Sequence, residues 1–99
     1  VNITSQLGSF ANTRGGTWQS YKASKAALNM CTRLQHGALQ QDDVCVVSMH
    51  PGWVQTDMGG SNARLTPQES VAGMVDVVDD LSMDDGGRFL TYAGEERPW

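Results

Sequence analysis

The fold is decided by one stretch of the sequence, Val44-Cys45-Val46-Val47-Ser48-Met49, which runs directly into His50-Pro51-Gly52. A continuous apolar run of this length is typical of a strand that is covered on both faces, as in a parallel sheet. Proline then ends the strand because it cannot extend the hydrogen-bond ladder, and glycine permits a sharp turn. The sequence therefore predicts a buried parallel strand whose carboxyl end meets a turn.

Helical patterns flank this strand on both sides. Upstream, apolar residues recur at helical spacing over residues 20–41. Downstream, Thr66-Pro67-Gln68-Glu69 predicts a helix start, because Thr66 can cap the helix and Glu69 can return a bond to the cap residue. An apolar stripe follows over residues 71–78.

Two further strands are predicted at the ends of the chain, over residues 1–5 and 88–92. The order is then strand, helix, strand, helix, strand, which is typical of an α/β protein with a parallel sheet and right-handed crossovers. Three strands and two helices are too few to cover both faces of the buried central strand. We therefore expect residues 1–99 to form the C-terminal part of one Rossmann-like, doubly wound domain, whose other half lies upstream.

Composition excludes several classes of protein. With 39% hydrophobic and 18% charged residues the chain is one globular piece rather than a disordered tail. No apolar run reaches the roughly 18 to 20 residues that cross a bilayer, and no secretion signal opens the chain. Four Lys or Arg over residues 1–41 are too sparse for a nucleic-acid groove. We expect a cytoplasmic protein with no membrane or nucleic-acid partner.

The net charge of −4 is unevenly distributed, with +4 over residues 1–41 and −8 over residues 42–99. The positive part can serve an anionic ligand such as a nucleotide cofactor, and uneven surface charge explains it equally well. Cys31 and Cys45 lie in apolar runs without metal-type spacing. We expect buried free thiols in a reducing cytosol, with a disulfide as the alternative, and no metal site.

Tyr21 and Lys25 are four residues apart at the start of the first helix, which places them on one face about 6 Å apart. A phenol titrates near pH 10, and a neighbouring cation stabilises the phenolate by up to about 4 kcal/mol at an effective dielectric near 20. Such a pair can make tyrosine an acid or base near neutral pH. By itself the spacing is also what any exposed helix start produces.

Other polar residues converge on the same place. Ser5 ends the first strand, at the edge where open α/β sheets form their ligand crevices. The turn at Pro51-Gly52 ends the second strand at this edge, and Thr56 follows it. We expect a crevice in which Ser5 donates to a substrate carbonyl while Tyr21 delivers a proton. No G-x-S-x-G motif surrounds any serine, so a hydrolase with Ser5 and His50 is disfavoured.

Three sequence blocks, in order, closely resemble the short-chain dehydrogenases/reductases. They are Asn2-Ile3-Thr4-Ser5, Tyr21-Lys22-Ala23-Ser24-Lys25-Ala26-Ala27-Leu28-Asn29-Met30 and His50-Pro51-Gly52-Trp53-Val54-Gln55-Thr56-Asp57-Met58-Gly59-Gly60. Within that family the chain looks most like the C-factor and sniffer-type carbonyl reductases. The likeness covers all 99 residues but only the C-terminal part of the family fold.

The resemblance implies an NAD(P)-dependent oxidoreductase acting on a small carbonyl or alcohol substrate, with NADPH slightly favoured over NADH. It makes Ser5, Tyr21 and Lys25 the catalytic residues. Lys25 would bond the nicotinamide ribose, and Tyr21 would be the proton donor or acceptor. The cofactor-binding set is Tyr21, Lys25, Pro51, Gly52, Val54 and Thr56, and Trp53 is the best placed of the tryptophans to shape the substrate pocket. Family likeness also implies a homodimer or homotetramer through the helix over residues 20–41.

Several family features are not present in the 99 residues. These are the TGxxxGxG phosphate turn, the Asn-Ala-Gly strand, the helix asparagine of the catalytic tetrad and the residue that selects NAD or NADP. Asp42-Asp43 also replaces the family's glycine turn. We therefore expect little NADPH binding by these residues alone. The alternative reading is a truncated, non-catalytic signalling or interaction protein derived from this fold.

Overall fold

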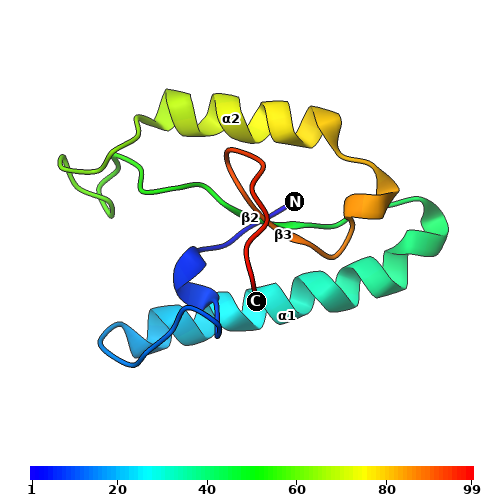
Figure 1. Cartoon of the computed structure of the whole chain (residues 1–99), viewed down its shortest axis with the longest axis horizontal. Coiled ribbons are helices and arrows are strands. Elements are labelled where there is room, and N and C mark those ends of the chain that lie inside the picture. Colours follow the sequence, from blue (N-terminus) through cyan, green and yellow to red (C-terminus); the bar gives the residue numbers. More distant parts are fainter.

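Three short parallel strands form a sheet in the order β1-β2-β3, with β1 at Asn2–Ile3, β2 at Ser48–His50 and β3 at Phe89–Thr91. The computed structural model describes all 99 residues. Helix α1 (Gln19–Leu39) lies on one side of the strands and helix α2 (Pro67–Asp80) on the other, as Figure 1 shows. Three 3₁₀ turns, η1 (Gln6–Gly8), η2 (Gln40–Asp42) and η3 (Met83–Asp85), complete the elements. The predicted α/β class and element order are confirmed.

The central strand is buried on both faces, as its apolar run predicts. Val47, Ser48 and Met49 are fully buried and Val46 is 7% exposed. Its regular ladder is shorter than the predicted run, because only residues 48–50 pair with β3. Backbone bonds nevertheless continue the pairing upstream, from the amide of Asn2 to the carbonyl of Val47 at 2.9 Å.

Helix α1 packs on the sheet through polar rather than apolar side chains. Thr32 is fully buried, and its hydroxyl accepts from Asn2 Nδ2 at 3.0 Å and from Ser48 Oγ at 2.7 Å. The same hydroxyl donates to the Leu28 carbonyl at 3.0 Å. One threonine thus joins α1 to both β1 and β2. Met30, on the other side of the helix, is 61% exposed.

Helix α2 begins as predicted, with a complete capping box between Thr66 and Glu69. Its apolar stripe, however, is not buried: Val71 and Val75 are 53% and 51% exposed. Val71 and Met74 instead line a cavity at the carboxyl edge of the sheet. Only Ser70 of this helix is buried.

The hydrophobic core is correspondingly small. Sixteen of the 99 residues are buried, and only six of these are hydrophobic, namely Val46, Val47, Met49, Ala63, Phe89 and Leu90. A core of six apolar side chains is thin for a domain of this length. Both cysteines are free thiols, as expected, although Cys31 is exposed rather than buried. No helix combines the length and the apolar character needed to cross a membrane.

Candidate functional site

A cavity of about 540 Å³ opens at the carboxyl edge of the sheet. Four segments build it: the turn η1 after β1, the start of α1, the loop after β2 and the first turns of α2. The carboxyl edge is where open α/β sheets bind their ligands. Its wall is formed by Ser5, Gln6, Leu7, Trp18, Tyr21, His50, Pro51, Gly52, Trp53, Val54, Thr56, Met58, Gly59, Pro67, Ser70, Val71 and Met74.

Ser5 is fixed by the turn that follows it. It caps η1, and its Oγ accepts the amide of Leu7 at 3.1 Å. The side chain is 93% buried yet reaches the cavity. Because this bond uses an oxygen lone pair, the hydroxyl proton remains free for donation into the cavity.

Gly8 allows η1 to lie directly on α1. A Cβ at this position would stand 2.8 Å from the carbonyl carbon of Lys25 and 2.9 Å from the amide nitrogen of Ala26. Asn29 adds a weak bond across the same contact, from Nδ2 to the Gly8 carbonyl at 3.4 Å. Glycine therefore sets the distance between the Ser5 turn and the helix that carries Tyr21.

Tyr21 and Lys25 lie side by side on α1, as their spacing predicts. Lys25 Nζ is 5.8 Å from the centre of the Tyr21 ring and donates to the Ile3 carbonyl at 3.2 Å. Trp18 packs edge-on against the other side of Tyr21, with ring centres 6.1 Å apart. Lys25 is not part of the cavity wall and adjoins it through the Tyr21 ring. A cation beside the ring and an indole edge together hold the phenol in place.

The loop after β2 is held by a chain of hydrogen bonds. Ser70 Oγ donates to the Pro51 carbonyl at 2.6 Å, which ties the loop to α2. Trp53 Nε1 donates to the Gly59 carbonyl at 2.9 Å, and the amide of Gly59 donates to Thr56 Oγ1 at 3.1 Å. These bonds close the loop into a compact wall.

Gly52 makes the turn at the head of this loop possible. Its φ of +87° lies in the left-handed region, and a Cβ there would collide with the Leu65 side chain and stand 3.0 Å from the ring of Tyr92. The side chains of Leu65 and Tyr92 fill the space that a Cβ would need, so only glycine fits at this turn.

The structure brings the predicted site residues together. Ser5, Tyr21, Pro51, Gly52, Trp53, Val54 and Thr56 all line the one cavity, and Lys25 adjoins it through Tyr21. Their functional roles stay predictions. Trp99 does not line this cavity, and its ring stacks on Phe89 with ring centres 5.5 Å apart.

Sequence reasoning missed part of the wall. Gln6 and Leu7 enter it through the η1 turn, and Ser70 and Met74 enter it from α2. A serine in the first turn of a capped helix, close to a strand-end loop, was the available signal for Ser70. The other residues depend on how the loops fold, which local patterns do not specify.

His50 also reaches the cavity but is not arranged for a hydrolase. Burial, and to a smaller extent the guanidinium of Arg97, lower the pKa of His50 below its ordinary 6.5. Its Nδ1 is buried without a hydrogen-bond partner, and no carboxylate lines the cavity. With nothing to orient the imidazole toward Ser5, the pair lacks the third member of a triad.

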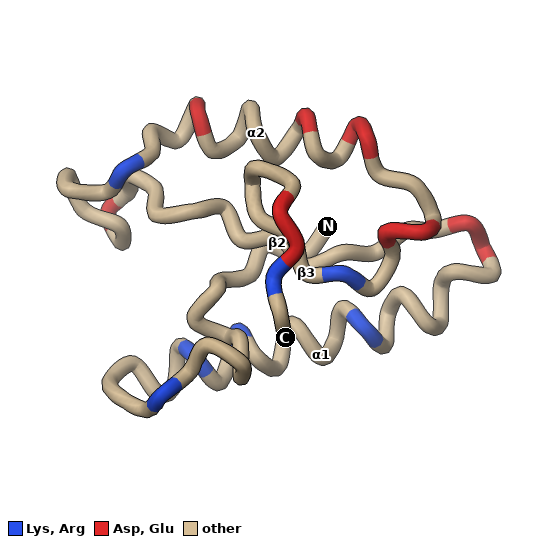
Figure 2. The backbone as a smooth tube through the Cα atoms, in the orientation of Figure 1, with Lys and Arg blue, Asp and Glu red and all other residues tan.

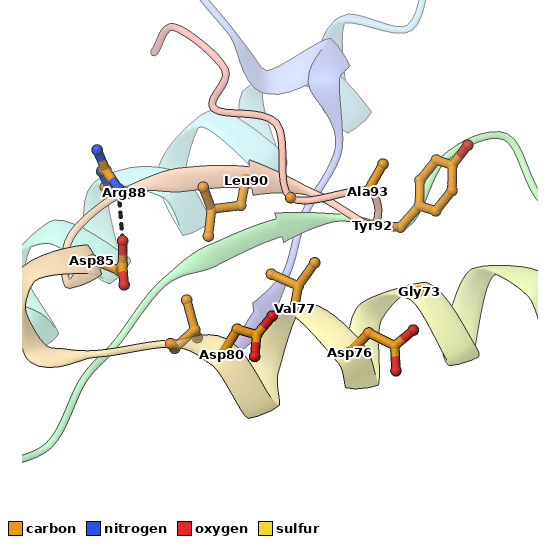
Figure 3. A pocket seen from close by; sticks show the side chains of 11 residues that line it. Gly73, Asp76, Val77, Asp80, Asp85, Arg88, Leu90, Tyr92 and Ala93 are labelled. Carbon is orange, nitrogen blue, oxygen red and sulfur yellow. Dashed lines mark hydrogen bonds and ion pairs between the residues drawn. The ribbon is translucent and has the colours of Figure 1, made fainter.

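A second hollow of about 440 Å³ lies between α2 and β3 (Figure 3). Asp76 and Asp80 face it from α2, and Asp85 is paired with Arg88 at 2.6 Å. Hydrogen bonds from the Ser82 backbone and side chain lower the pKa of Asp85. No group of three His, Cys, Asp or Glu side chains is placed to hold a metal ion. The acids here form a solvated edge.

Comparison with known proteins defines the family. Residues 1–66 match the family model described as short chain dehydrogenase, so the chain belongs to the short-chain dehydrogenase family. The resemblance seen in the three sequence blocks is thereby confirmed.

Individual relatives agree with this assignment. The chain is 48% identical over 100 residues to the C-signal protein of Myxococcus xanthus, covering all of this chain and 60% of that protein. It superposes on the carbonyl reductase Sniffer of D. melanogaster with a TM-score of 0.94 and 37% identity, over 98% of this chain and 39% of the fly chain. It superposes on an NADPH-bound carbonyl reductase from chicken fatty liver with a TM-score of 0.91 and 42% identity. That alignment covers 98% of this chain and 41% of the chicken chain. The chain thus spans 60% of the C-signal protein and about two fifths of the two carbonyl reductases.

Proposed function

We propose that this chain carries the proton-transfer half of an NAD(P)-dependent oxidoreductase that interconverts a small carbonyl compound and its alcohol. The observation that carries the proposal is the meeting of Ser5, Tyr21 and the 51–56 loop around one cavity, with Lys25 Nζ 5.8 Å from the Tyr21 ring. No carboxylate, metal-type cluster or hydrolytic triad competes for this position.

The walls of the cavity fit the nicotinamide end of the cofactor. Pro51, Gly52, Val54 and Thr56 line the cavity beside Trp53 and Met58, so the wall offers apolar surface for a flat ring together with the Thr56 hydroxyl. When bound, the cofactor supplies or takes up the hydride. We favour NADPH, because the similar chicken carbonyl reductase holds it.

Within this arrangement the chain's own residues handle the substrate oxygen and its proton. Ser5 donates its free hydroxyl proton to the carbonyl oxygen and orients it. Tyr21 gives its phenolic proton to that oxygen during reduction and takes it back during alcohol oxidation. Lys25 favours the phenolate that remains, because a cation stabilises an adjacent negative charge.

The test is Tyr21→Phe in the full-length protein. We expect turnover of aldehydes to fall by at least about 10²-fold, the lower range for a lost acid–base group. NADPH binding, followed by fluorescence, should change little because the ring remains. Turnover within a few-fold of wild type would contradict the role given to Tyr21.

We further propose that the phosphate-binding half of the cofactor site lies outside these 99 residues. Three observations support this: the sequence has no glycine-rich phosphate turn, the chain covers 39% of the Sniffer structure, and strand β1 is an open edge. Titration of the 99-residue chain with NADPH should then show little binding. Micromolar affinity would contradict the proposal.

The same observations leave a second candidate function, that of a non-catalytic signalling or interaction protein. What favours it is the 48% identity to the C-signal protein, together with the missing phosphate turn. The sequence upstream of Val1 discriminates the two. An in-frame TGxxxGxG motif there favours the enzyme, and a start codon there favours the truncated protein.

A second copy of the chain is the partner we propose for the outer side of α1. Leu34 is 67% exposed and Met30 61% exposed, four residues apart on one face of the helix. Covering them would give the homodimer expected from family likeness, or a homotetramer. Sedimentation of Leu34→Lys against wild type tests this, since a monomer in both would contradict it. A cytoplasmic location stays a prediction.

A further inference from the structure

Beside the main cavity lies a smaller hollow whose charged groups are all positive. It has a volume of about 370 Å³ and is lined by Gln6, Leu7, Asn12, Thr13, Arg14, Gly15, Lys22 and Arg97. Three of these eight residues are cations and none is an acid. We call this hollow the cation pocket. Figure 2 shows that the loop before α1 and the first turns of α1 carry Lys and Arg without Asp or Glu.

The three cations have no anionic partner. Both ion pairs of the chain belong to Arg88. Arg14 donates only to loop carbonyls, those of Ala11 at 2.9 Å and Thr13 at 3.2 Å, and Lys22 Nζ donates to the Gly15 carbonyl at 3.3 Å. These neutral contacts position the cations without neutralising them.

Of the three cations, Arg97 alone has a buried side-chain nitrogen without a hydrogen-bond partner. It is half-buried, and it donates from one terminal nitrogen to Gln6 Oε1 at 3.0 Å. Its Nε is buried and has no partner. Removing a guanidinium from water is unfavourable unless an anion or enough hydrogen bonds compensate it. An anion bound between Arg97 and the other two cations would supply that compensation.

The position of the cation pocket connects it to the proposed reaction. Gln6 and Leu7 line both the cation pocket and the main cavity. They belong to the three-residue turn η1, which is about 6 Å long at 2 Å per residue. A molecule lying across this turn can place its carbonyl at Ser5 and Tyr21 and its other end among the cations.

We propose that the cation pocket binds the carboxylate or phosphate end of a substrate whose carbonyl lies beside Tyr21. This inference rests on the proposed function and narrows its substrate class to anionic aldehydes or ketones with a short spacer. Guanidinium and ammonium groups are suited to carboxylate and phosphate oxygens. Two of the three cations, Arg14 and Lys22, belong to the positively charged segment 1–41, so the proposal assigns a ligand to part of that charge.

Two aldehydes that differ in one charge test the proposal in the full-length protein with NADPH. 4-Carboxybenzaldehyde carries its carboxylate at the far end of the ring, and benzaldehyde lacks it. We expect the wild type to prefer the charged aldehyde by at least about tenfold in kcat/KM, mostly through KM. The double variant Arg14→Gln/Lys22→Gln should lower this preference at least about fivefold, and 0.5 M NaCl should lower it in the wild type.

Arg64→Gln is the matched control, because Arg64 is an exposed arginine outside both hollows. It should leave the preference unchanged. An equal preference in the wild type and the double variant would overturn the proposal, as would a wild type that does not prefer the charged aldehyde.

A binding measurement keeps the result independent of turnover. Benzoate should shift the amide resonances of Gln6, Thr13 and Gly15 saturably in the wild type and not in the double variant. If neither aldehyde is reduced, the proposed reaction fails on these substrates, and this titration alone decides whether the pocket binds a carboxylate. Absence of the shifts with benzoate, phenyl phosphate and inorganic phosphate overturns the pocket. Saturation by inorganic phosphate, but by neither benzoate nor phenyl phosphate, would identify a free-anion site and overturn the assignment to a substrate end.

Discussion

Gly8→Ala tests whether close contact between η1 and α1 sets the geometry of the site. The added Cβ would stand 2.8 Å from the Lys25 carbonyl carbon, whereas ordinary contact begins near 3.4 Å, so the turn must move by about 0.6 Å. Both neighbouring atoms belong to the helix backbone and cannot rotate away. Overpacking of this kind costs about 1–3 kcal/mol.

Two measurements on the full-length protein report the effect. With a urea m-value of about 2 kcal/mol/M, the unfolding midpoint should fall by about 0.5–1.5 M. Since a misplacement of about 1 Å can cost 10²-fold in rate, a shift of about half that between Ser5 and Tyr21 should lower kcat roughly tenfold. Both effects follow from one displacement, so they should appear together.

Gly37→Ala is the matched control, because a Cβ on Gly37 meets nothing within 4 Å. Gly37 lies inside α1, where replacing glycine by alanine stabilises a helix by about 0.5–1 kcal/mol. The two substitutions should therefore move the midpoint in opposite directions. A Gly8→Ala protein that unfolds at or above the wild-type midpoint would refute the close-contact reasoning.

Two further predictions concern the interior of the sheet. Thr32→Val leaves the buried hydroxyl of Ser48 without its acceptor and leaves Asn2 Nδ2 with Gln35 Oε1 as its one remaining acceptor. It should lower the free energy of unfolding by about 1–3 kcal/mol, measured by urea denaturation. His50 has a folded-state pKa below its unfolded 6.5, because burial and Arg97 disfavour the charged form. The unfolded state therefore binds more protons between those two pKa values, and stability should fall as pH drops below 6.5. His50→Gln should flatten this part of the stability–pH curve, and an unchanged slope would assign it to another group.

The order of elements and their ends could be predicted from local chemistry. The apolar run at 44–49 places the central strand, and the Thr66–Glu69 pair places the start of α2 because a capping box depends on side chains three residues apart. Tyr21 and Lys25 were predictable as neighbours for a similar reason. Patterns within a few residues were sufficient for each of these features.

The packing of the helices was less predictable. Periodicity marks the apolar residues of α1, yet the two buried residues of this helix are Asn29 and Thr32. Thr32 bonds to Asn2 and Ser48 of the sheet, and Asn29 bonds to Gly8 of η1. The cation pocket is harder still to see in the sequence. It depends on Arg97 meeting Gln6 across a separation of 91 residues, and no local pattern predicts such a contact.

The candidate site is held mainly by polar and backbone contacts rather than by the hydrophobic core. Ser5 is fixed by the Leu7 amide, Pro51 by Ser70, and Lys25 by the Ile3 carbonyl. Only the Ser5 bond is local in the sequence, and the other two join residues that are 19 and 22 positions apart. All three contacts are made by polar groups and not by the six apolar core residues. Under the proposed function, Pro51 and Lys25 belong to the cofactor-binding set, whereas Ser5 contacts the substrate alone. Loss of the bond between Ser5 and the Leu7 amide should therefore change turnover before it changes cofactor affinity.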